Sequence, residues 1–441
     1  MKNKIVSLLL ILLISLSFFG CNKEGSGNTV SSENTHTEAV TTSHEIKGYD
    51  VVDSKMLDFG MDLYNSVHLT KGFDILTSNA QRKCYQLIEE SVFIISRGAE
   101  SGLYNLNPVS VNGSTLTEAE LHLIISAFTY DHPEVFWLNN SFSFYTKDGT
   151  TYLLLTSSMS ASEVTQAAGK MKSEIEEIFA GMPGNLSYFD RELYVHDKLS
   201  EKCEYADINS DSDIKSLIYT SYGSIVNGDA VCEGYTRGTQ LLLSLVGLES
   251  YYVFGRGNNE LHMWNCVLIQ DNWYYLDVTW DDNDSSDTTY AYFNITTEQA
   301  LAERTIAPMY ETLSEEEICG TDTESPVNFN IFIPECDSEN MSFYAHNCVT
   351  ITGVDDENLS VIANAIAQAA TKNQEAVYLY IDPYYLDFDS AKDSLLSGEY
   401  LIFECISRAN EMLEGVTVSD ETVETEESED LYILTVFFEY K

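Results

Sequence analysis

Apolar residues recur every three or four positions through much of the segment from residue 48 to residue 185. Because this spacing puts them on one helical face, it predicts helices over Gln81–Arg97, Thr117–Tyr130 and Ser162–Ala180. The second stretch opens with the letters TEAE, a capping box in which Thr117 is the cap and Glu120 its partner. One hairpin is expected where Asp148-Gly149 separates two short runs rich in aromatic and aliphatic residues. We therefore expect a mostly helical N-terminal domain over residues 48–185.

Residues 186–315 combine helical and strand patterns, which predicts an α+β domain. One helix is expected over Leu186–Glu204, and another runs from Cys232 to Val246, where Gly247 ends it. Alternating residues then predict two consecutive strands, Leu261–Ile269 and Trp273–Thr279.

Residues 325–441 have the pattern of a separate, small α/β domain. The expected strands are Asn328–Ile333, Val349–Ile351, Val377–Ile381 and Leu431–Tyr440. The expected helices are Leu359–Thr371 and Glu399–Leu413. The acidic stretch Ser419–Asp430 lacks the spacing of a calcium loop, so we interpret it as a solvated turn.

The first 20 residues have the pattern of an export signal. A basic start is followed by the apolar run Ile5–Phe19, which is short for a membrane span, and then by Gly20 and Cys21. This segment resembles a bacterial lipoprotein signal, which implies lipidation of Cys21; an ordinary secretory signal and an uncleaved anchor are the alternatives. Residues 21–47 are polar and predict a flexible tether. We expect an extracytoplasmic protein, lipid-anchored to the cell membrane.

Charge and cysteine content narrow the possible partners. The net charge is −47, from 23 basic and 70 acidic residues, which argues against nucleic acid as a partner and favours solubility as its main role. The nine cysteines are sparse and form no CxxC pair, so we expect few disulfides and no structural zinc. We expect no metal or cofactor.

Three residues between Gly228 and Asp282 have the types that cysteine-based acyl transfer requires. Cys232 lies in the first turn of its predicted helix, where partial positive charge and free N–H groups favour a thiolate and can bind an oxyanion. His262 is the candidate base, and Asp277 the carboxylate that orients its ring. Taken singly, each has an ordinary alternative: a buried structural cysteine, a surface histidine and a capping aspartate.

The strand register decides whether His262 and Asp277 meet. A two-residue turn at Asp271-Asn272 would pair Asp277 with Cys266, leaving His262 four residues, or roughly 13 Å, away. Direct contact needs a pairing centred on Ile269–Gln270, so we predict a wider loop or a bulge there.

Four further residues are candidates to line a substrate cleft. Gly234 leaves room for a substrate next to the thiol, and Tyr235 is its neighbour on the same helix. Trp264 and Asn265 follow His262, and Trp264 is one of three tryptophans in this stretch that could wall a cleft and exclude water.

The motifs VNGDAVCEGYT, ELHMWNCVL and WYYLDVTWDD together resemble the bacterial transglutaminase-like superfamily, which has a papain-like cysteine fold. The resemblance covers roughly residues 190–300 most specifically. It implies that Cys232, on a helix, His262, opening a strand, and Asp277, on the next strand, form a catalytic triad. It also implies acyl transfer through a thioester, with water or an amine as the acceptor.

The resemblance favours a cell-surface cysteine enzyme that acts on protein or peptide amides through a Cys232 thioester, as a peptidase or amidase. Two alternatives remain open at this point. The chain could be a non-catalytic lipoprotein that binds peptide or glycan in the same cleft, or a protein-crosslinking transglutaminase.

Overall fold

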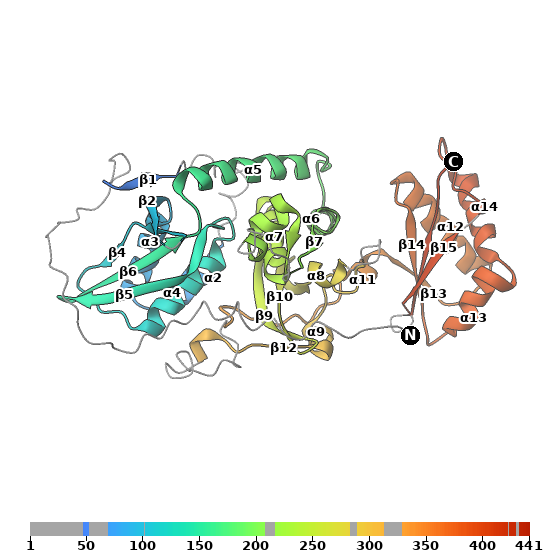
Figure 1. Ribbon diagram of the computed structural model, residues 1–441. Helices are drawn as coiled ribbons and strands as arrows, with labels where there is room; N and C mark the ends of the chain where they lie inside the picture. The colour runs from blue at the N-terminus through green and yellow to red at the C-terminus, as the bar shows by residue number, and fades with distance from the viewer. Residues whose placement is uncertain are drawn as a thin grey trace. The chain divides into compact units, whose positions relative to one another are not determined.

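The computed structural model describes residues 47–52, 69–100, 102–207, 217–282, 289–312, 329–421, 423–428 and 432–441. The chain forms two compact units, one ending at Ser338 and one running from Glu339 to Lys441 (Figure 1). Both units combine helices with β-sheets, so the predicted α+β class is confirmed. The expected signal segment, Cys21 and nearly all of the tether lie outside the described residues.

The N-terminal part of the first unit differs from the mostly helical domain that we predicted. Its helices are α2 (Lys71–Ile75), α3 (Asn79–Ser91), α4 (Glu118–Asp131) and α5 (Ala161–Ala180). Beside them lies a six-stranded sheet of β1 (Tyr49–Val51), β2 (Ile94–Glu100), β3 (Leu103–Leu106), β4 (Val109–Val111), β5 (Leu138–Lys147) and β6 (Thr150–Ser157). The periodicity misled us at Gln81–Arg97, because the helix ends at Ser91 and the apolar residues after it continue into β2.

The turn and capping motifs of this part predicted its structure better than the apolar periodicity did. The hairpin β5–β6 turns at Asp148 and Gly149, both at positive φ, as a two-residue turn between antiparallel strands requires. Helix α4 starts at the predicted capping box of Thr117 and Glu120. The same box starts three more helices of this unit that are at least 13 residues long, α3, α5 and α6 (Tyr188–Lys202).

The centre of the first unit is a helix packed on an antiparallel sheet. Helix α7 (Cys232–Leu245) buries most of its residues and contacts α6 and two strands of the sheet. The sheet order is β11 (Asn272–Leu276), β10 (Glu260–Ile269), β9 (Glu249–Gly257) and β12 (Arg304–Ile306). Shorter elements complete this part: β7 (Glu204–Tyr205), η4 (Leu217–Tyr219), η5 (Gly223–Asn227), β8 (Asp229–Ala230), α8 (Val278–Asp281), α9 (Thr297–Glu303) and η6 (Tyr310–Thr312).

The turn between β10 and β11 corrects our prediction of a bulge. Ile269 pairs with Asn272, so the turn consists of Gln270 and Asp271, both at positive φ, and the pairing continues without a shift. Extending this register places Asp277 opposite Trp264, two residues from His262. The turn is tight, but it lies one residue earlier than the Asp271-Asn272 turn considered from the sequence. It therefore places His262 and Asp277 as diagonal neighbours on one face of the sheet.

The boundary of the C-terminal domain also moves. We expected the domain to start at residue 325, but the segment after residue 328 packs in the first unit. The Asn330 side chain accepts from Phe254 N–H at 2.7 Å and donates to the carbonyls of Phe254 and Ala307. The predicted strand over Asn328–Ile333 forms only an isolated bridge between Met309 and Asn330 in its described part.

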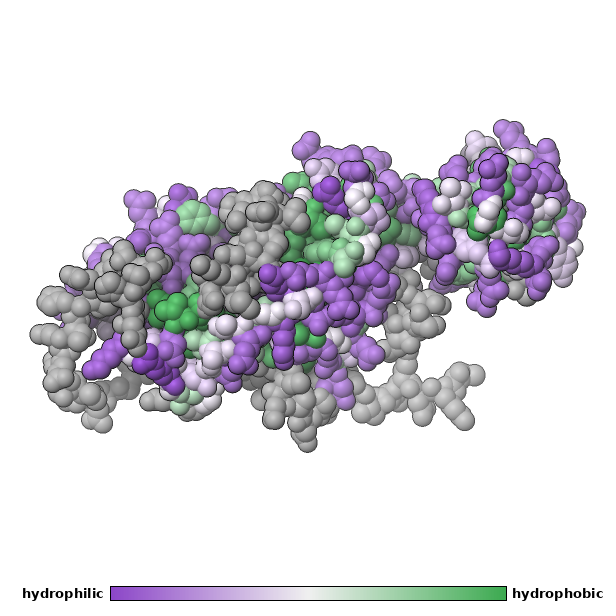
Figure 2. All heavy atoms as spheres, turned by 90° about the horizontal axis from the view of Figure 1, so that it is seen from above, coloured by the Kyte–Doolittle hydropathy of each residue, from purple (hydrophilic) through white to green (hydrophobic). Residues whose placement is uncertain are grey.

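The second unit, from Glu339, is a small α/β fold with its own core. Its sheet order is β13 (Cys348–Ile351), β14 (Ala376–Ile381), β16 (Ile433–Phe437) and β15 (Glu424–Ser428). Its helices are α11 (Phe343–Asn347), α12 (Asp356–Thr371), α13 (Phe388–Asp393), η7 (Ser394–Gly398) and α14 (Leu401–Met412). The acidic stretch expected to be a turn contains the edge strand β15, and Figure 2 shows this unit mostly covered by hydrophilic residues.

A buried acid–amide pair joins α6 to the segment that follows α8. Asn294 Nδ2 donates to Glu192 Oε2 at 2.7 Å, and both residues are fully buried. Two acceptors of the same pair, Glu192 Oε1 and Asn294 Oδ1, have no hydrogen-bond partner within the described part of the chain. A proton on Glu192 Oε1 would turn this atom into a donor and remove the buried carboxylate charge. Consistent with this, burial raises the pKa of Glu192 to about 8, although Asn294 and the neighbouring His196 oppose the shift.

This pair predicts a pH-dependent contribution to stability. Because the folded pKa of Glu192 is raised, the folded state keeps a proton that the unfolded chain releases, so the free energy of unfolding falls as pH rises from about 4.5 to about 8. In Glu192→Gln the neutral amide can still accept from Asn294 and has no titrating proton. Urea unfolding between these pH values should show that the free energy of unfolding of the variant, relative to that of the parent, rises by up to ~1.4 kcal/mol per pH unit.

The matched control is Glu201→Gln, which changes an exposed glutamate on the same helix. Its stability should follow the parent at every pH. Parallel curves for Glu192→Gln and the parent would show that Glu192 is ionised in the folded protein.

Candidate active site

Cys232 occupies the first position of α7. The cap residue before it, Val231, has an extended backbone and offers no side-chain hydrogen bond to the helix, so the partial positive charge of the helix start lies at Cys232. Cys232 is half-buried, whereas five of the other six described cysteines are buried. Burial raises the pKa of those six thiols, Cys84, Cys203, Cys266, Cys336, Cys348 and Cys405. Cys232 therefore has the environment that a reactive thiol needs.

His262 lies on β10 between two indole rings. The Trp280 ring stacks on it at 4.9 Å between centroids, and the Trp264 ring at 5.7 Å. The side chain is buried, and a hydrogen bond to Cys232 is among its contacts. Its Nε2 atom faces Asp277, which leaves Nδ1 as the ring nitrogen available to the thiol. The two tryptophans hold the ring plane and exclude water from it, whereas Trp273 packs elsewhere, against Phe332.

Asp277 marks the point where the chain leaves β11 and enters the short helix α8. Its Oδ2 lies 2.7 Å from His262 Nε2, and its Oδ1 accepts from Trp280 N–H at 3.2 Å, so the carboxylate also caps α8. The Asp277 N–H donates to the Tyr292 carbonyl at 3.1 Å. Leaving the sheet at this residue lets the carboxylate cover the last part of the distance to His262.

Arg304, which no motif in the sequence singles out, is the second cation on this carboxylate. Its Nη2 donates to Asp277 Oδ2 at 2.7 Å. The guanidinium lies 3.7 Å from the Trp280 ring centroid and 4.6 Å from that of Tyr292. It comes from β12, which pairs with β9 at Gly257, where an added Cβ would lie 2.4 Å from Trp280.

The electrostatics of the site follow from these contacts. Burial alone would raise the pKa of the Asp277 carboxyl, but His262 and Arg304 together hold it below its ordinary value. Burial would lower the pKa of His262, but Asp277, with a smaller contribution from Cys232, raises it well above its ordinary value. Both shifts favour a charged Asp277 and a protonated His262, the partner that a Cys232 thiolate requires.

Helix α7 is tied to β10 by hydrogen bonds that fix the thiol relative to the imidazole. Thr236 Oγ1 donates to the Met263 carbonyl at 3.0 Å, and Asn265 Nδ2 donates to the Thr236 carbonyl at 3.0 Å. A Cβ added at Gly234 would lie 2.3 Å from the Ile218 carbonyl, so the helix start packs directly on η4. These contacts form a rigid support on regular elements.

The four cleft candidates have supporting positions instead. The space beside Gly234 is filled by Ile218 rather than left for a substrate. Tyr235 is buried, and its hydroxyl donates to the Cys203 carbonyl and contacts the Asp282 carboxylate. Asn265 and Trp264 are buried as well, the first binding α7 and the second stacking on His262. None of the four lines an open surface, because each faces the packing between α7 and its neighbours.

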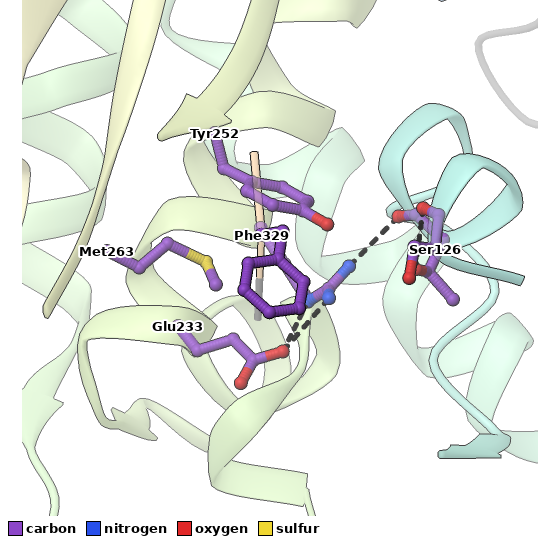
Figure 3. A pocket seen from close by; sticks show the side chains of 7 residues that line it. Ser126, Glu233, Tyr252, Met263 and Phe329 are labelled. Carbon is purple, nitrogen blue, oxygen red and sulfur yellow. Dashed lines mark hydrogen bonds and ion pairs between the residues drawn. The ribbon is translucent and has the colours of Figure 1, made fainter. Parts of the chain in front are cut away.

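Two features beside Cys232 are open to solvent. Tyr205 is exposed, and a hydrogen bond with the Cys232 backbone N–H is among its contacts, so its phenol lies at the N–H expected to bind an oxyanion. A small pocket lies between α4 and α7, lined by Ser126, Thr129, Glu233, Arg237, Tyr252, Met263 and Phe329. The guanidinium of Arg237 pairs with Glu233 and donates to the Thr129 carbonyl, so this pocket, shown in Figure 3, contains an internal ion pair.

Neither a metal-binding cluster nor a membrane-spanning helix is found among the described residues. No group of three or more His, Cys, Asp or Glu side chains among them is arranged to hold a metal ion. None of their helices has the length and apolar character to span a membrane.

Comparisons with known proteins give weak structural similarity only. No family model matches the chain, and neither does any curated protein. The crystal structure of a transglutaminase aligns with 42% of this chain and 54% of its own, at 14% identity and a TM-score of 0.24. A candidate cysteine protease from Cytophaga hutchinsonii aligns with 32% of this chain and 61% of its own, at 12% identity and a TM-score of 0.21. The alignment thus spans less than two thirds of either neighbour.

The geometry predicts that Asp277 is needed for stability as well as for orienting His262. Asp277→Asn removes the charge that Arg304 faces and leaves a buried guanidinium without a counterion, which should cost about 3–5 kcal/mol of unfolding free energy. Urea unfolding measures this loss. The control Asp271→Asn, on the exposed β10–β11 turn, should stay within about 0.5 kcal/mol of the parent. Equal stability of the two variants would contradict the proposed ion pair.

Proposed function

We propose that this chain is a cysteine enzyme that cleaves or transfers protein or peptide amides through a thioester on Cys232, acting as a peptidase or amidase. One observation carries the proposal. A half-buried thiol at a helix start, a buried histidine and a buried carboxylate come from three separate elements and meet in the order that nucleophilic catalysis requires.

The first half of the reaction follows from the positions of the groups. The Cys232 thiolate attacks the carbonyl carbon of the amide, and the start of α7 stabilises the oxyanion that forms. Protonated His262 transfers its proton to the amide nitrogen as the carbon–nitrogen bond breaks. The amine leaves, and the acyl group stays on sulfur as a thioester.

In the second half neutral His262 acts as the base. It removes a proton from water, the resulting nucleophile attacks the thioester carbon, and the carbon–sulfur bond breaks to release a carboxylic acid. Asp277 keeps the imidazole oriented through both halves. An amine in place of water would instead give a new amide and make the chain a crosslinking transglutaminase.

We place this activity at the cell surface. The motif ending at Cys21 and the polar tether after it support a lipid-anchored protein whose substrates are surface proteins or peptides. The excess of acidic residues speaks against nucleic acid as a partner. Membrane contact would be made through the lipid on Cys21.

Selective alkylation tests the nucleophile. With iodoacetamide between mildly acidic and neutral pH, Cys232 should be labelled well before the buried Cys84 and Cys405, as measured by peptide mass spectrometry. His262→Ala should slow the labelling of Cys232 on the order of a hundredfold, because the thiolate loses its cation. The control His346→Ala, in the second unit, should change nothing. A Cys232 no more reactive than Cys405 would favour a non-catalytic module that binds peptide or glycan.

Trapping the intermediate tests the reaction. Incubation with cell-surface extract, followed by acid quenching, should give a Cys232 peptide whose added mass is released by hydroxylamine, as a thioester requires. Cys232→Ala should give none. Products formed with and without a small primary amine then identify the acceptor: a free acid in both cases indicates hydrolysis, and amine incorporation indicates crosslinking. An unmodified Cys232 with every extract that yields labelled controls would contradict acyl transfer.

A further inference from the structure

The Asp277 carboxylate binds two cations through one oxygen. Oδ2 lies 2.7 Å from His262 Nε2 and 2.7 Å from Arg304 Nη2, while Oδ1 accepts from the Trp280 backbone N–H at 3.2 Å. His262, Asp277 and Arg304 are each at least 95% buried by accessible surface. In such a site neither cation is screened by water, so each one affects how strongly the carboxylate holds the other.

Arg304 occupies this position at a cost. Its Nε and Nη1 atoms have no hydrogen-bond acceptor within the described part of the chain. The rings of Trp280 and Tyr292 offset part of that cost by cation–π contact. A well-packed apolar residue would generally serve stability as well as a buried ion pair does. The arrangement therefore points to a role for the positive charge itself.

The positive charge of Arg304 sets the net charge of the buried site. With Cys232 as thiolate and His262 as imidazolium, the site contains two negative groups, Cys232 and Asp277, and one positive group besides Arg304. Arg304 brings the sum to zero, and the sum is also zero when the thiol and the imidazole are both neutral. Arg304 thus makes the buried site neutral in both protonation states, whereas without it both states would have a net charge of −1.

Other ionisable groups nearby already have partners of their own. Asp281, on α8, is bound by His196 Nε2 at 3.2 Å, and Tyr292 donates to Glu303 Oε2 at 3.0 Å. Tyr205 faces Cys232 from β7 as a neutral phenol. Arg304, on β12, binds Asp277 in addition to His262.

We propose that Arg304 is a positioning residue of this site: it binds the same Asp277 oxygen as His262 and shares its charge, so that the imidazolium can release its proton to a leaving group. Without Arg304, Asp277 would serve His262 alone and hold the imidazolium too tightly. This inference rests on the proposed function, because it assigns Arg304 a part in the same thiol–imidazole pair.

The test is the pH dependence of Cys232 alkylation by iodoacetamide in the purified full chain. Arg304→Gln removes one buried positive charge, which raises the proton affinity of both Cys232 and His262. The midpoint of the rate profile should move up by about one pH unit. Turnover of any substrate that forms the acyl-enzyme should fall at least tenfold. A residue that only supports the fold would lower the rate or the Tm and leave the midpoint in place.

Two further variants make the outcome decisive. Arg304→Lys keeps the charge but not the planar fork or the ring stacking, so it should keep the midpoint within a few tenths of a unit while losing rate. It also serves if Arg304→Gln does not fold, since a midpoint shifted by a full unit in Arg304→Lys would overturn the charge argument. Arg408→Gln, which removes an exposed guanidinium of the second unit, should match the parent in both readouts.

The proposal is overturned if Arg304→Gln keeps the alkylation midpoint of Arg408→Gln, whether or not its turnover falls. A failure of the proposed function would give a different result: in the parent protein, Cys232 would react with iodoacetamide no faster than Cys405.

Discussion

The candidate site depends on one buried carboxylate, Asp277, which connects three parts of the chain. It receives His262 from β10 and Arg304 from β12, and through its own backbone and Oδ1 it starts α8. A buried charge is tolerated only when it is paired and hydrogen-bonded, so these partners are held in place by the cost of leaving Asp277 alone. The position of the imidazole, and with it the chemistry that we propose for Cys232, follows from this electrostatic constraint.

The surrounding fold keeps that constraint rigid. Helix α7 is fastened to β10 through Thr236 and Asn265, so the thiol and the imidazole cannot move independently. The rings of Trp264 and Trp280 enclose His262, and Trp280 also lies under Arg304. Farther out, α6 is held to the same region by His196 on Asp281 and by Glu192 on Asn294. These buried polar contacts surround the candidate site and fix it to helices and strands instead of loops.

Tyr205 and a small pocket that contains an ion pair lie near the start of α7. Tyr205 lies at the Cys232 N–H, and Arg237 links α7 to α4 across a pocket that it shares with Glu233. The N-terminal part of the first unit therefore reaches the vicinity of the thiol through α4, where Arg237 and Gln240 donate to the carbonyls of Thr129 and Tyr130.

The sequence by itself determined the local features: the start of α7 at Cys232, the capping box at Thr117, the Asp148-Gly149 hairpin, and the residue types and order of the three candidate site residues. These depend on neighbours within a few positions, which is why patterns reveal them. Tertiary structure decided the rest. The turn at Gln270-Asp271 fixed the register, long-range pairing built the N-terminal sheet, and packing buried Tyr235 and Asn265 away from any cleft. Arg304 reaches Asp277 across 27 positions through a sheet pairing that no local pattern contains.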